Sequence, residues 1–354
     1  MNTRTRILYI INSLNVGGAQ VGFSRLVTGL NPDQYDVTVV ALNGGQKEIV
    51  GRVPDWVELI DFDGSFGTVL TKSDPFLRIV RSADVIVGSL FHSVLVARAA
   101  GLLNRRARVL TWQHSSEFKS PIRRWLFKYS ANLSDLNLAD SESVGEMFLT
   151  ELKLNEKHVH VVPIAGISLN DFQPVRHEGT TDIVVGSIGQ LSEAKNYHVL
   201  LKVAECLSNT DIDFKVAGDG VMREELVSAV DDRGLTNVRF LGDINHIPDF
   251  LSTTDIYFQP SKREGLCIAV LEAMAAGLPV VGSEVGGIGR NVDHGRTGIL
   301  CNPEDVAGFV SSIRLLARKP ELRNQFGDAG RVLVSEKYSQ KRLVDEFSSA
   351  ISVL

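Results

Sequence analysis

Short, nearly continuous apolar segments alternate with longer amphipathic segments along the whole chain, and this alternation constrains the fold more than any other feature. In the first half, the apolar segments include ILYII (7–11), VTVVAL (37–42) and VIVGSL (85–90). Strands of this kind are buried on both faces, and helical stretches between them indicate βαβ units around a parallel sheet. The sequence therefore predicts an α/β fold.

The same pattern begins again in the second half, where IVVGSIG (183–189) and FKVAGDG (214–220) are the first two predicted strands. Between the two series, residues 163–181 are rich in Gly, Pro and polar residues and lack hydrophobic periodicity, which is typical of a linker. The length of 354 residues also fits two domains. We therefore expect two doubly wound parallel sheets of similar size.

The domain boundaries follow from the same pattern. We place an N-terminal domain at residues 1–165 and a C-terminal domain at residues 175–338. The last segment, residues 339–354, has apolar residues at helical spacing. We expect this segment to form a helix that packs back onto the N-terminal domain.

Composition excludes several classes of protein. The net charge of −5 argues against binding of nucleic acid. No apolar run reaches the ~18 residues that a membrane-spanning helix needs. The three cysteines are widely spaced and form neither a zinc pattern nor a disulfide framework, which fits a reducing cytoplasm. We therefore expect a cytoplasmic location.

Open parallel sheets bind ligands at the carboxyl ends of their strands, and several candidate residues follow predicted strands. Gly17 and Gly18 precede the first helix, where the backbone can approach a ligand closely. His114 follows the strand at 109–112 and can donate a hydrogen bond or move a proton. A tight turn and a structural histidine remain the alternatives. The dinucleotide fingerprint G-x-G-x-x-G is missing, which disfavours a Rossmann dehydrogenase.

The most informative stretch of the second half is REGLCIAVLEAMAAGLPVVGSEVGG (263–287). A strand is expected to end at Ser261 and Glu264 to lie in the loop after it, and a helix that carries Glu272 is expected to open at Gly265 and Leu266. On a helix the two carboxylates would lie near one face, about 12 Å apart along the axis. Carboxylates accept hydrogen bonds from paired sugar hydroxyls. The amides at the helix start suit a phosphate, and they belong to Gly265, Leu266 and Cys267.

Two further strand ends carry candidate phosphate contacts. Lys195 lies just before a predicted helix and can neutralise a phosphate as a point charge. Gly218 lies in AGDG (217–220), which resembles a turn on the phosphate or base side of a nucleotide. A solvated lysine and an ordinary turn are the alternatives.

Residues 98–128 contain eight basic residues and a single acidic residue, Glu117. Within FKSPIRRWLFKY (118–129), Trp125 is interleaved with the basic residues Arg123, Arg124 and Lys128. A basic amphipathic helix with aromatic residues indicates binding to an anionic membrane surface. The alternative is a solvated helix in which Trp125 is buried.

Taken together, these motifs resemble those of the family-4 retaining glycosyltransferases of the GT-B fold. The resemblance covers nearly the whole chain, and its most specific element is the Glu-x7-Glu string from Glu264 to Glu272. Supporting motifs are GGAQ (17–20), VPIAGISLNDFQP (162–174), AGDG (217–220) and VRFLGD (238–243). It implies two Rossmann-like domains facing across a cleft, the N-terminal one for the acceptor and the C-terminal one for a nucleotide-sugar.

The resemblance also implies roles for individual residues. Lys195 would hold the diphosphate and Glu272 the ribose. Glu264 would bind hydroxyls of the donor sugar, together with the backbone at 265–267. The reaction would retain the anomeric configuration by front-face attack as the diphosphate leaves. No metal or other cofactor is implied, because lysine and helix amides stabilise the leaving charge.

In the N-terminal half, the resemblance implies that Gly17 and Gly18 face the diphosphate across the cleft and that His114 lies beside the donor sugar. The chain departs from the family at two places. Gln190 stands where the family usually has Arg, and we expect Arg263 or Arg290 to compensate for the missing charge. The string Gly-Gly-Ile-Gly-Arg (286–290) replaces the usual Gly-Gly-x-Pro-Glu.

The expected function is transfer of a sugar from a UDP-sugar to a hydroxyl of a saccharide, with a lipid-linked or cell-surface polysaccharide precursor as acceptor at the inner face of the membrane. Two alternatives stay open. One is a GT-B nucleotide-sugar epimerase, which would need additional acid and base residues. The other is an inactive binding subunit, which Gln190 favours.

Overall fold

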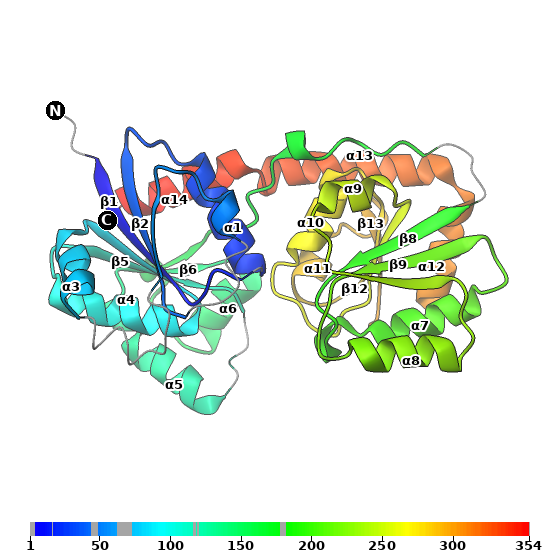
Figure 1. Cartoon of the computed structure of the whole chain (residues 1–354), viewed down its shortest axis with the longest axis horizontal. Helices are drawn as coiled ribbons and strands as arrows, with labels where there is room; N and C mark the ends of the chain where they lie inside the picture. The colour runs from blue at the N-terminus through cyan, green and yellow to red at the C-terminus, as the bar shows by residue number, and fades with distance from the viewer. Residues whose placement is uncertain are drawn as a thin grey trace. The chain divides into compact units, whose positions relative to one another are not determined.

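The computed structural model describes residues 4–15, 17–43, 49–61, 73–115, 118, 120–177 and 182–353 (Figure 1). Glu117 and Lys119 of the basic stretch and residues 178–181 of the expected linker lie outside these ranges. The chain divides into two compact units. Unit 1 comprises Met1–Gly166 and Gln340–Leu354, and unit 2 comprises Ile167–Ser339.

Unit 1 is built on a sheet of seven parallel strands, in the order β3-β2-β1-β4-β5-β6-β7. The strands are β1 (Thr5–Ile11), β2 (Tyr35–Ala41), β3 (Glu58–Asp61), β4 (Val85–Ser89), β5 (Arg108–Gln113), β6 (Leu136–Ala139) and β7 (Val159–Val161). The helices are α1 (Gly18–Gly29), α3 (Ser73–Ser82), α4 (Phe91–Leu103), α5 (Pro121–Ser130), α6 (Glu142–Thr150) and α14 (Gln340–Ser352), with 3₁₀ turns η1 (Val50–Arg52), η2 (Ala131–Leu133) and η3 (Glu156–His158).

Unit 2 repeats this plan with six parallel strands in the order β10-β9-β8-β11-β12-β13. The strands are β8 (Ile183–Ile188), β9 (Ile212–Ala217), β10 (Val238–Gly242), β11 (Ile256–Gln259), β12 (Val280–Ser283) and β13 (Gly298–Cys301). The helices are α7 (Tyr197–Cys206), α8 (Arg223–Asp232), α9 (Ile247–Ser252), α10 (Ile268–Ala275), α11 (Gly286–Asn291), α12 (Val306–Arg318) and α13 (Pro320–Lys337), with 3₁₀ turns η4 (Leu169–Asp171) and η5 (Glu193–Lys195).

Both sheets therefore have the doubly wound order, which confirms the predicted α/β architecture. Helices cover both faces of each sheet, so the strands are buried on both sides (Figure 1). In such a sheet the strand order reverses beside the first strand, here between β1 and β4 and between β8 and β11. Ligands of open α/β sheets bind at the carboxyl ends of the strands at this reversal.

The last helix, α14, packs within unit 1, although the chain has passed through unit 2 before reaching it. Phe347 of α14 stacks on Trp112 of β5, with ring centroids 5.8 Å apart and an interplanar angle of 7°. The Gln340 side chain donates to the Arg25 carbonyl of α1 at 2.8 Å. Burial of apolar side chains against the sheet holds α14 there.

The segment that precedes β8 is tied to α13 by side chains on one face of that helix. Arg331 donates to the carbonyl of Phe172 at 2.8 Å, and Asp328 accepts from Arg176 at 2.7 Å. Asn324 accepts from the His177 amide at 3.0 Å. Three and four residues separate these positions, so they share one face of α13. Residues 167–177 consequently belong to unit 2.

A buried arginine anchors α5 to the sheet of unit 1. Arg98 of α4 is 1% exposed, and its guanidinium donates to the Phe127 carbonyl at 2.9 Å and to the Asn137 side chain at 2.8 Å. Its charge also lies 4.3 Å from the centre of the Phe127 ring. Burial lowers the pKa of Arg98 to about 9.

Within the described ranges, no helix is both long and apolar enough to cross a membrane.

Candidate active site

The candidate active site lies in unit 2, where the chain leaves β8 and β11 at the reversal of strand order. The segment after β8 contains η5, and the segment after β11 runs from Pro260 to Glu264. The two segments are in contact, because the Lys262 amide donates to the Ala194 carbonyl at 2.8 Å. The strand order therefore brings residues about seventy positions apart in the sequence to one place.

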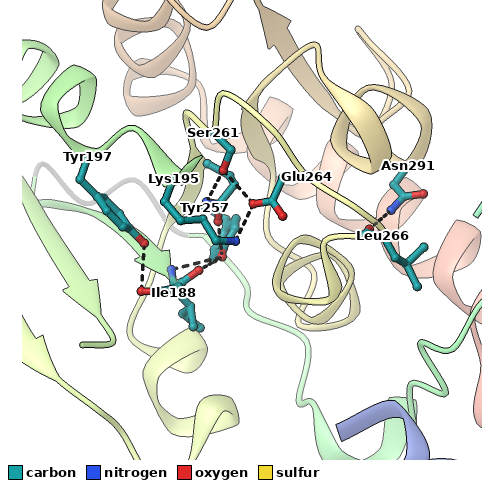
Figure 2. Close-up of polar contacts among 10 residues, drawn as sticks. Ile188, Lys195, Tyr197, Tyr257, Ser261, Glu264, Leu266 and Asn291 are labelled. Atoms are coloured by element: carbon teal, nitrogen blue, oxygen red, sulfur yellow. Dashed lines mark hydrogen bonds and ion pairs between the residues drawn. The ribbon is translucent and has the colours of Figure 1, made fainter. Parts of the chain in front are cut away.

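Lys195 and Glu264 form an ion pair at this position (Figure 2). The Lys195 ammonium donates to the Glu264 carboxylate at 2.5 Å, and the side chains are 19% and 10% exposed. Burial alone would lower the pKa of Lys195, but the Glu264 carboxylate raises it above the ordinary lysine value. Lys195 is therefore a fixed cation, which suits contact with a phosphate.

A chain of buried polar side chains supports Glu264 from β11. Ser261 donates to the same Glu264 oxygen as Lys195, at 2.8 Å, and Gln259 donates to Ser261 at 2.9 Å. The Tyr257 hydroxyl donates to Gln259 at 3.0 Å (Figure 2). Gln259 and Ser261 are fully buried, so these bonds fix the carboxylate against the strand end. Sequence reasoning missed these three residues, although all of them lie within one predicted strand, IYFQPS (256–261).

Asn196 and Tyr197, the two residues after Lys195, are also fixed by hydrogen bonds. Tyr197 donates to the Gly189 carbonyl at 3.4 Å, and burial raises its pKa to about 12. Asn196, between Lys195 and Tyr197, adopts the left-handed conformation and donates to the Pro260 carbonyl at 3.1 Å. The two residues that follow Lys195 are therefore fixed by side-chain hydrogen bonds to the segments after β8 and β11.

The expectation that a helix opens at Gly265 and Leu266 is wrong. α10 begins at Ile268, and Cys267 before it has a left-handed conformation, with φ 55° and ψ 65°. A right-handed helix cannot continue through such a residue. Glu264 lies in a loop, as expected, but residues 265–267 are not helical, so the predicted spacing of about 12 Å along one helix does not describe the two carboxylates.

Glu272 lies in the second turn of α10 and is 3% exposed. Burial raises the pKa of the Tyr257 hydroxyl, and the negative charges of neighbouring groups, Glu272 among them, contribute in the same direction. Both carboxylates of the Glu-x7-Glu string are thus held inside unit 2 rather than in solvent.

The loop between Glu264 and α10 rests directly on the backbone of α11. A Cβ atom on Gly286 would lie 2.0 Å from the Glu264 carbonyl oxygen, and one on Gly287 would lie 2.0 Å from the Gly265 oxygen. The Gly287 amide donates to that Gly265 oxygen at 2.8 Å. Only glycine permits this approach at both positions. The first two residues of the string 286–290 therefore shape the loop that carries Glu264.

Gly218 is placed by a similar close approach. Its φ is +127°, and a Cβ atom there would lie 2.2 Å from the Gly189 carbonyl oxygen. Its amide donates to the Gly242 carbonyl at 2.7 Å. Gly218 therefore brings the ends of β8, β9 and β10 together beside Lys195.

Gln190, which stands where the family usually has arginine, is exposed at the end of β8. The two arginines expected to compensate for it are also exposed, Arg263 next to Glu264 and Arg290 in α11. Among the described residues, no three His, Cys, Asp or Glu side chains gather in a way that could hold a metal ion.

The candidate residues of unit 1 lie at strand ends of its own sheet. Gly17 is the N-cap of α1 and Gly18 its first residue. His114 follows β5 and is 9% exposed, with the Ser89 hydroxyl 2.8 Å from Nε2 and the Asp140 carboxylate 3.5 Å from Nδ1. Sequence reasoning missed Ser89 and Asp140, although Ser89 ends β4 and Asp140 follows β6.

Helix α5 carries the basic and aromatic residues that were expected to form an exposed amphipathic surface, with a buried Trp125 as the alternative. Trp125 is 57% exposed, so the alternative is wrong. Arg124 pairs with Glu151 at 3.1 Å, and the Arg123 guanidinium lies 5.1 Å from the Phe91 ring centre. The exposed apolar side chains of α5 are Ile122, Trp125, Leu126 and Tyr129.

Two family models match the chain, one in each unit. The model of Glycosyltransferase Family 4 matches residues 16–165, and that of Glycosyl transferases group 1 matches residues 170–333. The chain belongs to the family-4 glycosyltransferases of the GT-B fold. An uncharacterized glycosyltransferase of Haemophilus influenzae is 24% identical to this glycosyltransferase over 357 residues, which cover 97% of this chain and 98% of the relative.

Solved structures of low sequence identity share the fold of this glycosyltransferase. Anabaena Alr3699/HepE, in complex with UDP and glucose, matches with a TM-score of 0.84 at 19% identity over 99% of this chain and all of that one. The lipopolysaccharide outer core galactosyltransferase WaaB matches with a TM-score of 0.76 at 18% identity over 99% of this chain and all of that one. The predicted GT-B fold and enzyme class are confirmed.

The contact between α11 and the Glu264 loop makes Gly287→Ala a direct test of the loop's support. A methyl group there would collide with the Gly265 carbonyl, so the loop has to move. We expect the free energy of unfolding of unit 2 to fall by about 1–3 kcal/mol, measured by urea denaturation. Gly289→Ala is the matched control in the same helix, because its nearest neighbour would lie at 3.4 Å. Equal stability of the two variants would contradict the packing described here.

Proposed function

We propose that this glycosyltransferase moves a sugar from a UDP-sugar to a hydroxyl of a saccharide, with retention of the anomeric configuration. The observation that carries the proposal is the pair of Lys195 and Glu264, which are fixed together at the reversal of strand order. Beside this pair, the amides of residues 265–267 donate to no other described residue. A cation, free amides and buried carboxylates together suit a nucleotide diphosphate joined to a sugar.

The diphosphate is assigned to Lys195 and the loop amides. When the bond between the anomeric carbon and the phosphate oxygen breaks, negative charge develops on the leaving diphosphate. A lysine with a raised pKa stays charged throughout, and fixed amides need no reorganisation as this charge grows. These groups supply the positive charge that a cation would otherwise bring, so we propose a reaction without a metal cofactor.

The sugar and the nucleoside are assigned to the two glutamates. Glu264 keeps one carboxylate oxygen on Lys195 and Ser261, and its other oxygen remains able to accept from hydroxyls of the donor sugar. Glu272 would accept from the ribose hydroxyls, with Gly218 and Gln190 also on the donor side. The UDP bound to Anabaena Alr3699/HepE supports uridine diphosphate as the leaving group.

The step itself is a substitution at the anomeric carbon. The acceptor hydroxyl forms the new bond from the face that the diphosphate leaves, and its proton passes to the departing phosphate oxygen, which retains the configuration. Gly17 and Gly18 are assigned to the diphosphate and His114 to the donor sugar. A product assay with a panel of nucleotide-sugars and lipid-linked acceptors tests this proposal. Epimerised donor without any glycoside product would refute it, and so would nucleotide binding without turnover.

For the acceptor, we propose a lipid-linked or cell-surface polysaccharide precursor at the inner face of the membrane. The support is the surface of α5, whose apolar residues are exposed beside basic ones. WaaB, which matches in fold, is a lipopolysaccharide galactosyltransferase. A nearby hollow of about 400 Å³ adds positive charge, since three arginines and a single carboxylate line it: Arg105, Arg106, Arg108 and Asp135.

Lys195→Ala removes the proposed diphosphate cation. We expect turnover to fall by about 100-fold to 1,000-fold, because the developing charge loses a preorganised partner. Steady-state assays of transfer would measure this, with acceptor KM expected to change little. Lys202→Ala, an exposed lysine of α7, is the control. Normal turnover in Lys195→Ala would rule out the assigned role.

Glu272→Gln keeps the shape of the side chain and removes its charge. We expect UDP to bind about 10-fold to 100-fold more weakly in calorimetry, because a hydrogen bond to a charged acceptor is replaced by a neutral one. Glu224→Gln, on the exposed surface of α8, is the matched control. If both variants bind UDP as the unsubstituted protein does, Glu272 does not contact the nucleoside.

The membrane proposal predicts binding to vesicles that contain phosphatidylglycerol. Because each basic residue near an anionic surface contributes about 1 kcal/mol, the triple substitution Arg123→Gln, Arg124→Gln and Lys128→Gln should weaken binding about 100-fold. Sedimentation with vesicles measures this, and added salt should weaken binding as well. Arg78→Gln with Arg81→Gln on α3 is the control. Vesicle binding that does not depend on salt concentration would refute the proposal. So would a lack of vesicle binding by the unsubstituted protein.

A further inference from the structure

The orientation of two peptide groups in the Glu264 loop is set by α11. The Gly265 carbonyl accepts from the Gly287 amide at 2.8 Å, and the Leu266 carbonyl accepts from the Asn291 side chain at 2.6 Å (Figure 2). In a planar trans peptide the N–H group points opposite to the C=O group. The amides of Leu266 and Cys267 therefore both point away from α11.

This loop conformation needs external support. Cys267 is not glycine and still has a φ of 55°, a conformation that is strained for a residue with a side chain. Strained residues of this kind persist only where neighbouring groups hold them. The bond from Asn291 to the carbonyl of the preceding residue is such a constraint, because it fixes the peptide group that leads into Cys267.

Asn291 is itself held in place by a residue at the end of α13. It is 2% exposed, and its side-chain oxygen accepts from the Tyr338 hydroxyl at 2.7 Å. An amide side chain donates only through nitrogen and accepts only through oxygen. The tyrosine therefore determines which end of the Asn291 amide faces Leu266.

Tyr338 also lies where the chain passes between the two units. Its carbonyl accepts from the Ile167 amide at 2.8 Å, and Ile167 is the first residue of unit 2. Unit 2 ends one residue after Tyr338, at Ser339. Tyr338 thus contacts the first residue of unit 2 through its backbone carbonyl and, through its hydroxyl, the asparagine that holds the loop after Glu264.

We infer that Tyr338 and Asn291 are positioning residues for the donor, which turn the amides of Leu266 and Cys267 toward the diphosphate. The inference rests on the proposed function, and neither residue touches the reacting atoms. Its chemistry is simple: the Tyr338 hydroxyl orients the Asn291 amide, and the amide orients the Leu266 peptide. Loss of the hydroxyl should leave the loop able to adopt other orientations.

Tyr338→Phe removes the hydroxyl and keeps the ring. UDP binding, measured by calorimetry, should weaken about threefold to tenfold, as expected for loss of one hydrogen bond. The melting temperature of unit 2 should change little. Tyr35→Phe on β2 in unit 1 is the matched control. In a double-mutant cycle, Tyr338→Phe should add little to the effect of Asn291→Ala, because Tyr338 acts on the loop only through Asn291.

Hydrogen exchange tests the inference without any ligand. The Gly287 amide is protected by its bond to Gly265 while the loop is docked. Tyr338→Phe should accelerate exchange in residues 284–291 and leave β6 and β12 unchanged. Exchange that accelerates throughout unit 2 would indicate a general structural role and overturn the inference.

The remaining outcomes separate the two proposals. If the unsubstituted protein binds no UDP, the proposed function fails, and the exchange measurement still decides whether Tyr338 holds the loop. If it binds UDP and Tyr338→Phe binds equally well, the inference fails while the proposed function stands. Additive effects of the two substitutions would likewise show that Asn291 and Tyr338 act separately.

Discussion

The ion pair between Lys195 and Glu264 is the constraint on which the site of unit 2 depends. Neither charge could be buried to this degree alone, because an unpaired ion in the protein interior is strongly unfavourable. Their meeting requires that the segments after β8 and β11 be adjacent, which follows from the reversal of strand order. Ser261, just after β11, donates to the same carboxylate oxygen and is itself held by Gln259, so that one Glu264 oxygen is fixed and the other stays able to accept.

Close backbone approach is the second feature that shapes this site. Gly286 and Gly287 let α11 pack on the loop that carries Glu264, and Gly218 lets β9 approach β8. These contacts leave no room for a side chain, so the loop is defined by its neighbours rather than by its own helical tendency. The departure of residues 286–290 from the usual family sequence preserves the two glycines that make this contact.

Much of the fold could be predicted because buried parallel strands leave a direct signal of continuous apolar residues. Two strands were missed, β6 and β13. β6 reads Leu-Asn-Leu-Ala, so the polar Asn137 interrupts its apolar run. The Asn137 side chain is buried and accepts a hydrogen bond from Arg98. β13 contains only four residues and follows a helix of six, so neither has enough length for a periodic pattern.

The sequence by itself determined the two-sheet architecture, the family and most of the residue types at the strand ends, since these depend on local pattern and motif. Only the tertiary structure decided that α10 begins at Ile268 and not at Gly265, because the left-handed Cys267 is stabilised by contacts with α11 that no local pattern contains. It also revealed Tyr257, Gln259 and Ser261 as the support of that carboxylate. Hydrogen bonds between residues far apart in the chain form only after the strands are ordered, which is why periodicity could not predict them.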